Sequence, residues 1–179
     1  KFSKVKVTGT LSYVKPQNKS AKAVTIPAKI TVNGGTYTVT AIADKAFRNN
    51  KKITKITIGN NVRTIGINVF YNCKKLKTVT LGKKVETIGN NAFGKCTALT
   101  KITIPAKVKK IGKQSFAGCK KLKTITVKTT KLKKSSVGVS AFKGISTKAT
   151  IKVPKSKLKS YRSILRSRGA SRKVKIKKV

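Results

Sequence analysis

The sequence predicts a β-rich solenoid built from stacked repeats, and three observations support this fold class. One phenylalanine and one cysteine recur at a constant interval of 23 residues. Short runs within each interval alternate apolar and polar residues, which is the period-2 pattern of β-strands. A single repeat buries too few residues to fold alone, so the stack is the folding unit. The recurring positions are Phe47, Phe70, Phe93 and Phe116, with Cys73, Cys96 and Cys119.

Three complete repeats cover residues 54–76, 77–99 and 100–122, with the common form L-x-x-I-x-I-[GP]-x-x-V-x-x-I-G-x-x-[AVS]-F-x-x-C-x-x-L. The I-x-I piece is expected to be a short strand, and stacked copies would pair into a parallel sheet. Glycine or proline then turns the chain. The glycine after the next isoleucine is expected to have positive φ. A short helical turn, at 91–95 in the second repeat, would bury the phenylalanine.

Residues 1–40 depart from the repeat and predict an N-terminal β cap. Strands are expected over 5–7 and 11–14, followed by a hairpin through 33–35 into a strand over 37–41. A cap is required because the terminal coil of a solenoid would otherwise expose its apolar side.

Regular repeats fill residues 41–127, and an irregular repeat follows at 128–155. Phe142 follows Phe116 by 26 residues instead of 23. The extra residues are expected to loop out of the stack near 131–136. All of these parts belong to a single domain, because the repeats fold only as one stack.

Residues 156–179 predict a C-terminal cap made of a helix and a strand. The helix, over 156–168, places its apolar residues on one face, and Gly169 is suited to end it. Val174 and Ile176 alternate with lysines and predict the last strand. The apolar face of the helix consists of Leu158, Tyr161, Ile164 and Leu165.

Basic residues far outnumber acidic ones: the chain has 45 Lys and Arg and two acids, which gives a formal charge of +43. Such a balance is typical of disordered chains, but the strict periodicity indicates a folded stack. The charge favours polyanions such as nucleic acid, acidic polysaccharide, teichoic acid or an anionic membrane surface. Most lysines are also simply suited to a solvated surface. No run approaches the roughly 20 apolar residues that span a bilayer, so membrane insertion is not expected.

The residue types argue against an enzyme. The chain has no histidine, and its two acids, Asp44 and Glu86, are isolated in sequence. Paired-carboxylate, Ser-His-Asp and Cys-His mechanisms are therefore excluded. No CxxC pair or phosphate-binding glycine loop occurs, so we expect no metal and no cofactor. The cysteines are predicted to be three free, buried thiols that form a column, with a redox role as the alternative.

Two interactions of the acids follow from the repeat. Arg63, Glu86 and Lys109 occupy the same position in consecutive repeats, so the glutamate should lie between two cations. Asp44 precedes the turn that holds Phe47 and is expected to be a helix N-cap.

The polar residues of the predicted strands form the candidate binding face. They should stack into columns of threonine flanked by lysine on the exposed side of the sheet. The structural alternative is that threonine is only a favourable residue for a solvated strand. The candidate face consists of Lys55, Thr57, Thr78, Thr80, Lys101, Thr103, Thr124 and Thr126.

The repeat resembles the BspA-like leucine-rich repeats of bacterial and some protozoan surface proteins, as in LTKITIPAKVKKIGKQSFAGCKKL at 99–122. The flanks TYTVTAIADKAF and IKVPKSKLKSYRSIL are similar to those of such repeats in gut Firmicutes. The resemblance implies a leucine-rich-repeat solenoid in the C-terminal region of a larger secreted or cell-wall protein. It carries over no site residues, because the shared positions are structural.

Three functional hypotheses follow. The first is a non-catalytic module for adhesion that binds host or bacterial surface proteins or anionic cell-wall polymers. The second is nucleic-acid binding, which the charge allows only non-specifically, because the repeated phenylalanines belong to the core and leave few stacking platforms. The third is a structural spacer or cap in a longer chain. A monomer is expected, because the charge opposes self-association.

Overall fold

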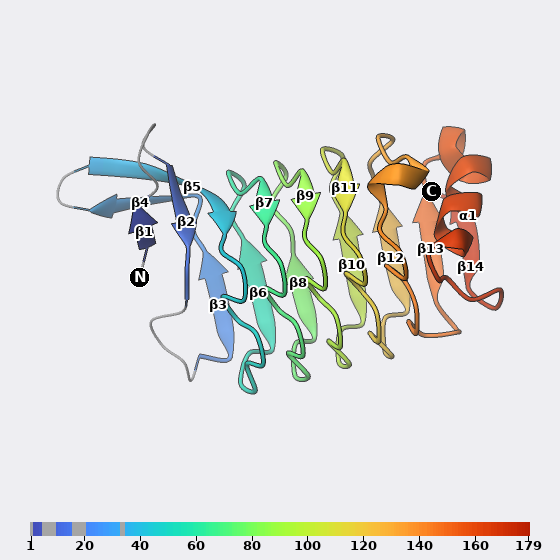
Figure 1. Cartoon of the computed structure of the whole chain (residues 1–179), viewed down its shortest axis with the longest axis horizontal. Helices are drawn as coiled ribbons and strands as arrows, with labels where there is room; N and C mark the ends of the chain where they lie inside the picture. Colours follow the sequence, from blue (N-terminus) through green and yellow to red (C-terminus); the bar gives the residue numbers. More distant parts are fainter. Residues whose placement is uncertain (1, 5–9, 16–20, 33–34) are drawn as a thin grey trace.

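The computed structural model describes residues 2–4, 10–15, 21–32 and 35–179. It is an elongated β-solenoid whose coils stack along one axis between an N-terminal group of strands and a C-terminal helix (Figure 1). Two sheets run along the stack, and each has seven strands among the described residues. The predicted fold class is therefore confirmed.

The first sheet, called here the long parallel sheet, takes one strand from each coil. Neighbouring strands pair in parallel register, so that Ile56 lies beside Val79, and Ile102 beside Ile125. Its strands are β3 (Ala23–Ile26), β6 (Lys55–Ile58), β8 (Thr78–Thr80), β10 (Lys101–Ile104), β12 (Thr124–Val127), β13 (Thr150–Val153) and β14 (Lys175–Lys178). Equal repeat length produces this register, because each coil brings the equivalent residue to the same position around the solenoid, one strand farther along its axis.

The second sheet combines the N-terminal strands with one short strand from each regular coil. β2 pairs in parallel with β5, while β1 and β4 pair antiparallel with β2 and β5. The predicted strand at 5–7 and part of the hairpin turn at 33–35 lie outside the described residues. The strands are β1 (Phe2–Lys4), β2 (Thr10–Tyr13), β4 (Lys29–Val32), β5 (Gly35–Ile42), β7 (Thr64–Ile65), β9 (Thr87–Ile88) and β11 (Lys110–Ile111).

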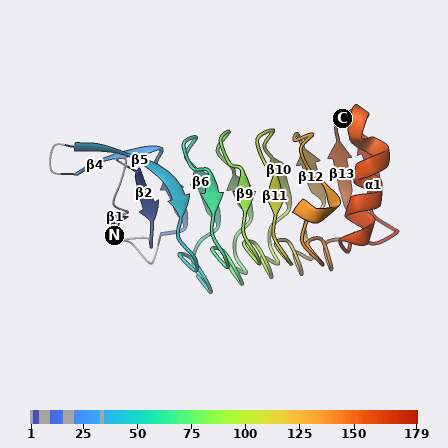
Figure 2. The same ribbon diagram turned by 45° about the horizontal axis from the view of Figure 1, so that its top comes forward.

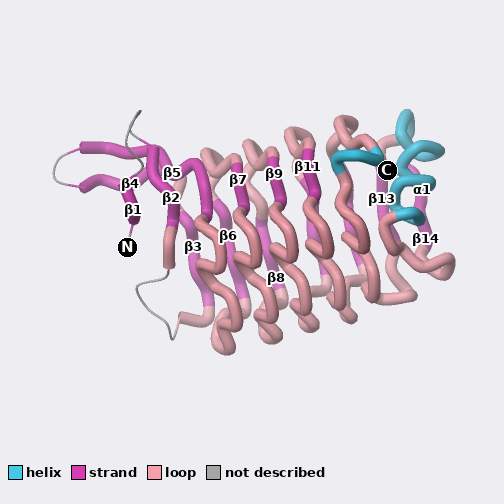
Figure 3. The backbone as a smooth tube through the Cα atoms, in the orientation of Figure 1, coloured by secondary structure: helices cyan, strands magenta, loops and turns pink. Residues whose placement is uncertain are grey.

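The turns that hold the phenylalanines are not helical, which corrects the sequence prediction. Each of these phenylalanine turns spans five residues, and its first and last residues have positive φ, 53° at Asn91 and 58° at Lys95 in one example. The backbone N–H of Phe93 therefore donates to Ser115 O of the next coil, at 2.8 Å. Bonds between coils replace those of a helix, so these segments are loops in Figure 3. The five turns are 45–49, 68–72, 91–95, 114–118 and 140–144.

The core is a column of stacked side chains that runs the length of the solenoid. Phe47 and Phe70 have ring centroids 5.1 Å apart, and the column continues at similar spacing to Phe142. Tyr13 from β2 stacks on Phe47 at 5.5 Å, so the N-terminal cap extends the same column. Offset stacking of this kind stabilises neighbouring aromatic rings beyond the burial of their area.

The constant spacing of glycine from repeat to repeat has a different cause from the one predicted. Gly66, Gly89 and Gly112 do not have positive φ. Instead, a Cβ atom on Gly89 would lie 2.4 Å from Gly66 O, and one on Gly112 would lie 2.5 Å from Asn90 N. Glycine is needed because the backbones of adjacent coils approach closely at this point.

The C-terminal cap agrees with its prediction. A 3-10 turn at Lys155–Lys157 leads into α1 (Leu158–Ser167), which covers the end of the stack (Figure 2). Gly169, with φ of 97°, ends the helix, and Arg168 O accepts the backbone N–H of Phe142 at 3.0 Å. The residue that follows the helix thus accepts one hydrogen bond that another phenylalanine turn would have accepted.

A single side chain of the cap helix, that of Tyr161, forms hydrogen bonds to the backbone of the stretched repeat. The predicted loop contains a 3-10 turn at Lys134–Ser136. Tyr161 is buried beneath this region, where its hydroxyl donates to Thr129 O and accepts the backbone N–H of Leu132, both at 3.0 Å. The buried phenol therefore satisfies backbone groups that the irregular repeat leaves without coil partners.

We predict that Gly89→Ala lowers the free energy of unfolding by about 3 kcal/mol, because the added methyl group forces adjacent backbones apart. Gly118→Ala is the control, since Gly118 has positive φ but a Cβ there would meet only ordinary contacts at 3.7 Å. It should cost about 1 kcal/mol, the strain of a left-handed alanine. Urea denaturation followed by circular dichroism measures both, and equal losses would contradict the close-approach explanation.

Candidate functional site

The outward side of the long parallel sheet carries the predicted binding residues. In each strand the apolar residues point into the core, with Ile56 and Ile58 at 0% and 2% exposure. The polar residues between them point outward, and none of the eight is buried. The Thr/Lys face consists of two columns, Lys55-Thr78-Lys101-Thr124 and Thr57-Thr80-Thr103-Thr126.

The structure extends the Thr/Lys face beyond the residues that the sequence predicted. Thr150 and Lys152 of β13 pair with Thr124 and Thr126, and Lys175 and Lys177 of β14 continue both columns. The 23-residue period does not reveal these strands, because β13 follows a stretched repeat and α1 is inserted before β14. Alternation of apolar and polar residues predicted the last strand, but not its place in this sheet, and the same signal was available for β13.

A second missed feature is the arrangement of lysines where the strands begin. The dipeptides at 54–55, 77–78, 100–101 and 123–124 read Thr-Lys, Lys-Thr, Thr-Lys and Lys-Thr. Neighbouring strands lie about 4.8 Å apart, so stacked lysines would repel at close range. The alternation places two lysines of the same column about 10 Å apart. Each of these coils contributes one lysine to the start of its strand, and all four are exposed: Lys55, Lys77, Lys101 and Lys123.

This surface offers a regular array of hydroxyl groups and ammonium charges. Threonine hydroxyls donate and accept hydrogen bonds, and lysine adds three donors with a positive charge. The face contains no acid, and the described residues include no group of His, Cys, Asp or Glu able to hold a metal ion. The array is therefore suited to recognising polar or anionic surfaces.

The ion pairs of Glu86 lie on another corner of the coil and agree with the prediction. Its carboxylate contacts Lys109 Nζ and Arg63 Nη1, each at 2.6 Å. The hydrogen bonds from Lys109 and Arg63, together with their charges, lower the pKa of Glu86. The carboxylate is thus engaged as a link between three coils.

Asp44 differs from its prediction as a helix cap. Its Oδ1 accepts the backbone N–H of Ile67, 23 residues later, at 2.6 Å. Asn90 makes the same bond to the N–H of Lys113 at 2.8 Å. Asp44 therefore connects two coils, because the segment after it is a phenylalanine turn with no helix to cap.

The cysteines form a buried column, as predicted, and all three are free. Each thiol donates to a phenylalanine carbonyl of the preceding coil, as Cys96 does to Phe70 O at 3.0 Å. Burial raises the pKa of Cys73 and of Cys119 to about 12 and that of Cys96 well above its ordinary value. The thiolate required for nucleophilic or redox chemistry is therefore scarce at neutral pH.

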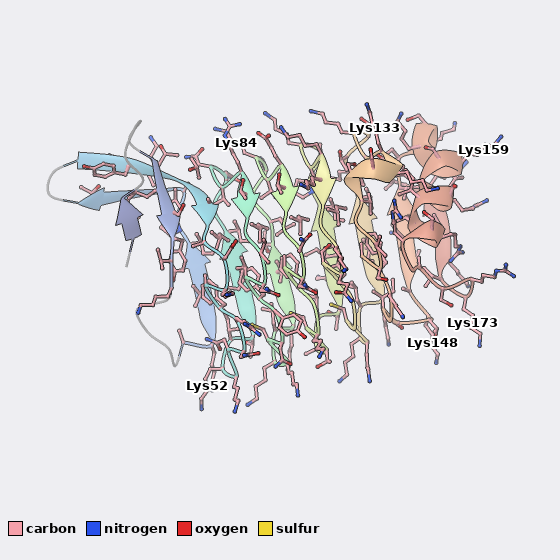
Figure 4. The ribbon with its side chains drawn as sticks, viewed as in Figure 1. Lys52, Lys84, Lys133, Lys148, Lys159 and Lys173 are labelled. Atoms are coloured by element: carbon pink, nitrogen blue, oxygen red, sulfur yellow. The ribbon has the colours of Figure 1, made fainter. Side chains whose placement is uncertain are left out.

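Within the described part of the chain, no helix is long and apolar enough to cross a membrane. Lysines instead surround the solenoid at the corners where the coils turn. Lys52 and Lys148 project from one long edge, and Lys84 and Lys133 from the opposite edge (Figure 4). The long parallel sheet, which carries the Thr/Lys face, lies between these two basic edges.

Comparison with known proteins identifies the repeat. The family model described as the BspA type leucine-rich repeat region matches residues 40–167 in six copies. No curated protein matches the sequence.

Solved structures share the fold. The Treponema pallidum leucine-rich repeat protein (T. pallidum TpLRR) superposes with a TM-score of 0.74 at 23% identity, over 85% of this chain and 67% of that chain. A leucine-rich repeat protein from Bacteroides capillosus gives 0.60 at 33% identity, over 66% of this chain and 87% of that chain. A leucine-rich cell surface protein from Faecalibacterium prausnitzii gives 0.62 at 28% identity, over 81% and 41%.

We predict that the folded protein does not react with a thiol reagent at about pH 8, because buried, protonated thiols are poor nucleophiles. Unreduced protein in denaturant should release three reactive thiols per chain, in agreement with three free cysteines. Absorbance of the released chromophore measures both states. Rapid reaction of the native protein, or fewer than three thiols after unfolding, would contradict the buried free column.

We predict that Glu86→Gln lowers the melting temperature at neutral pH and low salt, because the coils then present Arg63 and Lys109 without a counter-charge. The folded protein holds the pKa of Glu86 below 4.5, so its stabilisation is present above that pH and is lost as the pH falls through the lowered pKa. The difference between the two proteins should therefore shrink in acid and in high salt. A difference that persists in both conditions, measured by thermal circular dichroism, would contradict an electrostatic origin.

Proposed function

The chain belongs to the BspA-type leucine-rich repeat family, and on that premise we propose that it is a non-catalytic binding module for adhesion. It acts outside the cell, on the surface or in the cell wall. The proposed parent is a larger surface protein of a gut Firmicutes-type bacterium, with this domain in its C-terminal region. Support comes from the family match and from the F. prausnitzii relative, which is named as a cell surface protein.

The single observation that carries the proposal is the continuous Thr/Lys face. Seven parallel strands present one side to solvent, and their polar columns remain in register from coil to coil. Such a surface is rigid before a partner arrives, so binding does not require ordering of a loop. Solenoids use extended surfaces of this kind to contact large partners.

A non-catalytic role follows from how the reactive residues are used. The chain has no histidine, and both of its acids link coils through ion pairs or a backbone hydrogen bond. The three thiols are buried, and burial raises the pKa of each. The Thr/Lys face thus carries no histidine, carboxylate or thiol, the groups that most often transfer protons or attack substrates near neutral pH.

The proposed partners are host or bacterial surface proteins or anionic cell-wall polymers. Threonine hydroxyls suit the polar groups of proteins and glycans, and the lysines suit acidic ones. The protein is proposed to act as a monomer, because a charge of +43 opposes self-association.

The second candidate is diffuse binding of polyanions, including non-specific binding of nucleic acid. The observation that favours it is the spread of lysines over both edges of the solenoid (Figure 4). Binding of this kind depends on the number of charges and weakens steeply as salt increases. Specific recognition by the Thr/Lys face should depend on position and survive screening.

We predict that the protein binds purified Gram-positive cell wall or mucin more strongly than double-stranded DNA in roughly 0.3 M salt. Lys55→Ala/Lys101→Ala should weaken the retained binding about fivefold or more, as loss of central contacts does. A neutral variant, Thr80→Gln/Thr103→Gln, should also weaken it, because larger side chains disturb a shaped surface without changing charge. Surface plasmon resonance over a salt series measures each affinity.

The matched control is Lys84→Ala/Lys107→Ala, which removes the same charge from exposed positions outside the Thr/Lys face. It should retain nearly wild-type affinity. Equal losses in both lysine variants, with no effect of the threonine variant and equal salt-sensitive binding to all three probes, would establish diffuse charge and contradict the proposal.

A further inference from the structure

Lysine pairs occupy one corner of the coil, where the chain passes from a phenylalanine turn toward the long parallel sheet. Two consecutive coils carry them at 51–52 and 74–75. The third coil has Thr97 and Ala98 at this position, and the fourth has lysines again at 120–121. Two adjacent lysine pairs therefore meet at only one place in this series.

At that place the surface is hollowed. A recess of about 590 Å³ lies between the two coils, and every residue that lines it is an asparagine or a lysine. All four lysines are exposed. The lining residues are Asn49, Lys51, Lys52, Asn72, Lys74 and Lys75.

The two asparagines are fixed by one hydrogen bond. Asn72 Nδ2 donates to Asn49 Oδ1 at 2.9 Å, and both residues close their phenylalanine turns with φ near 60°. This bond uses one N–H of Asn72 and leaves its second N–H, together with the amide N–H groups of Asn49, as donors. Later coils place Gly118 and Gly144 at the same position, which shows that the turn itself does not need an amide.

The chain supplies no counter-charge for this recess. Its two acids are Asp44 and Glu86. Glu86 contacts Arg63 and Lys109, and Asp44 accepts a backbone N–H at the start of a phenylalanine turn. Because adjacent strands lie about 4.8 Å apart, ammonium groups stacked on consecutive coils repel one another. A bound anion would remove this repulsion while the amides supply hydrogen bonds.

Further cations lie around the recess. A smaller hollow of about 320 Å³ shares Lys51 and Lys52 with it and adds Arg48. The ring of Tyr71 lies beneath Arg48 Cζ at 5.8 Å and Lys95 Nζ at 5.5 Å, and so holds one cation from each neighbouring coil beside it. The positive charge here is thus concentrated and partly positioned by an aromatic ring.

We propose that this recess is a binding site for a ligand carrying two or more linked phosphate groups. Phosphate fits because lysine binds it as a compact point charge and amides donate to its oxygens. Linked phosphates fit because the lysines come in pairs from two coils. The site shares no residue with the Thr/Lys face, so it is independent of the proposed adhesive function.

The test measures binding of sodium tripolyphosphate to the whole chain by isothermal titration calorimetry, with orthophosphate and a sulfated oligosaccharide as comparison ligands. Wild-type protein should bind tripolyphosphate most tightly. Lys51→Ala/Lys74→Ala should weaken this binding about tenfold or more, the usual cost of losing charged hydrogen bonds. Asn72→Gly, which keeps a residue suited to positive φ, should weaken it several-fold.

The matched control is Lys120→Ala/Lys121→Ala, which removes two lysines from the same corner of the fourth coil. The preceding coil has Thr97 and Ala98 at this corner, so these two lysines have no lysine pair beside them there. It should change the affinity less than about twofold, the effect of lost background charge. Nuclear magnetic resonance adds a local readout, in which the side-chain amide signals of Asn49 and Asn72 shift on titration. Equal losses in the two lysine variants, unmoved amide signals, or equally tight, variant-sensitive binding of the sulfated oligosaccharide would each overturn the proposal.

Discussion

Hydrogen bonding between the backbones of successive coils is the interaction on which the rest of the structure depends. It sets the coil spacing near the usual 4.8 Å of paired strands, and each phenylalanine turn donates N–H groups to the next coil. Gly89 and Gly112 are required by this spacing, because a Cβ atom would collide with the coil before. The phenylalanine rings follow the same spacing, with centroids 5.1 to 5.6 Å apart.

The same constraint separates structural positions from the candidate binding positions. Side chains that point inward must stack on copies of themselves, so the repeat fixes isoleucine, phenylalanine, cysteine and leucine. Side chains that point outward meet only their neighbours and solvent, so lysine, threonine and asparagine vary there. The Thr/Lys face and the lysine-lined recess both arise from outward positions. Both proposed sites therefore depend on variation between coils rather than on the consensus.

Much of the fold was predictable because periodicity reports which side chains are buried. The strands β6, β8, β10 and β12 of the long parallel sheet, the column of buried thiols, the contacts of Glu86 and the cap helix all follow from equal spacing and apolar pattern. The errors concern groups that bond between coils. The turn at 91–95, the φ of Gly89 and the partner of Asp44 were read within one repeat, whereas their partners lie in the next one. The recess was not predicted, because it requires two coils and a fixed amide pair.

The alternation of lysine and threonine at the start of the strands gives the surface a longer period than the backbone. The core repeats with every coil, but Thr-Lys returns only with every second coil. Duplication of one coil within the gene would keep the core intact while stacking two lysines in one column. Duplication of two coils would preserve both the core and the charge pattern. A duplication therefore leaves the surface charge pattern unchanged only when it copies a pair of coils, although the backbone geometry repeats with every single coil.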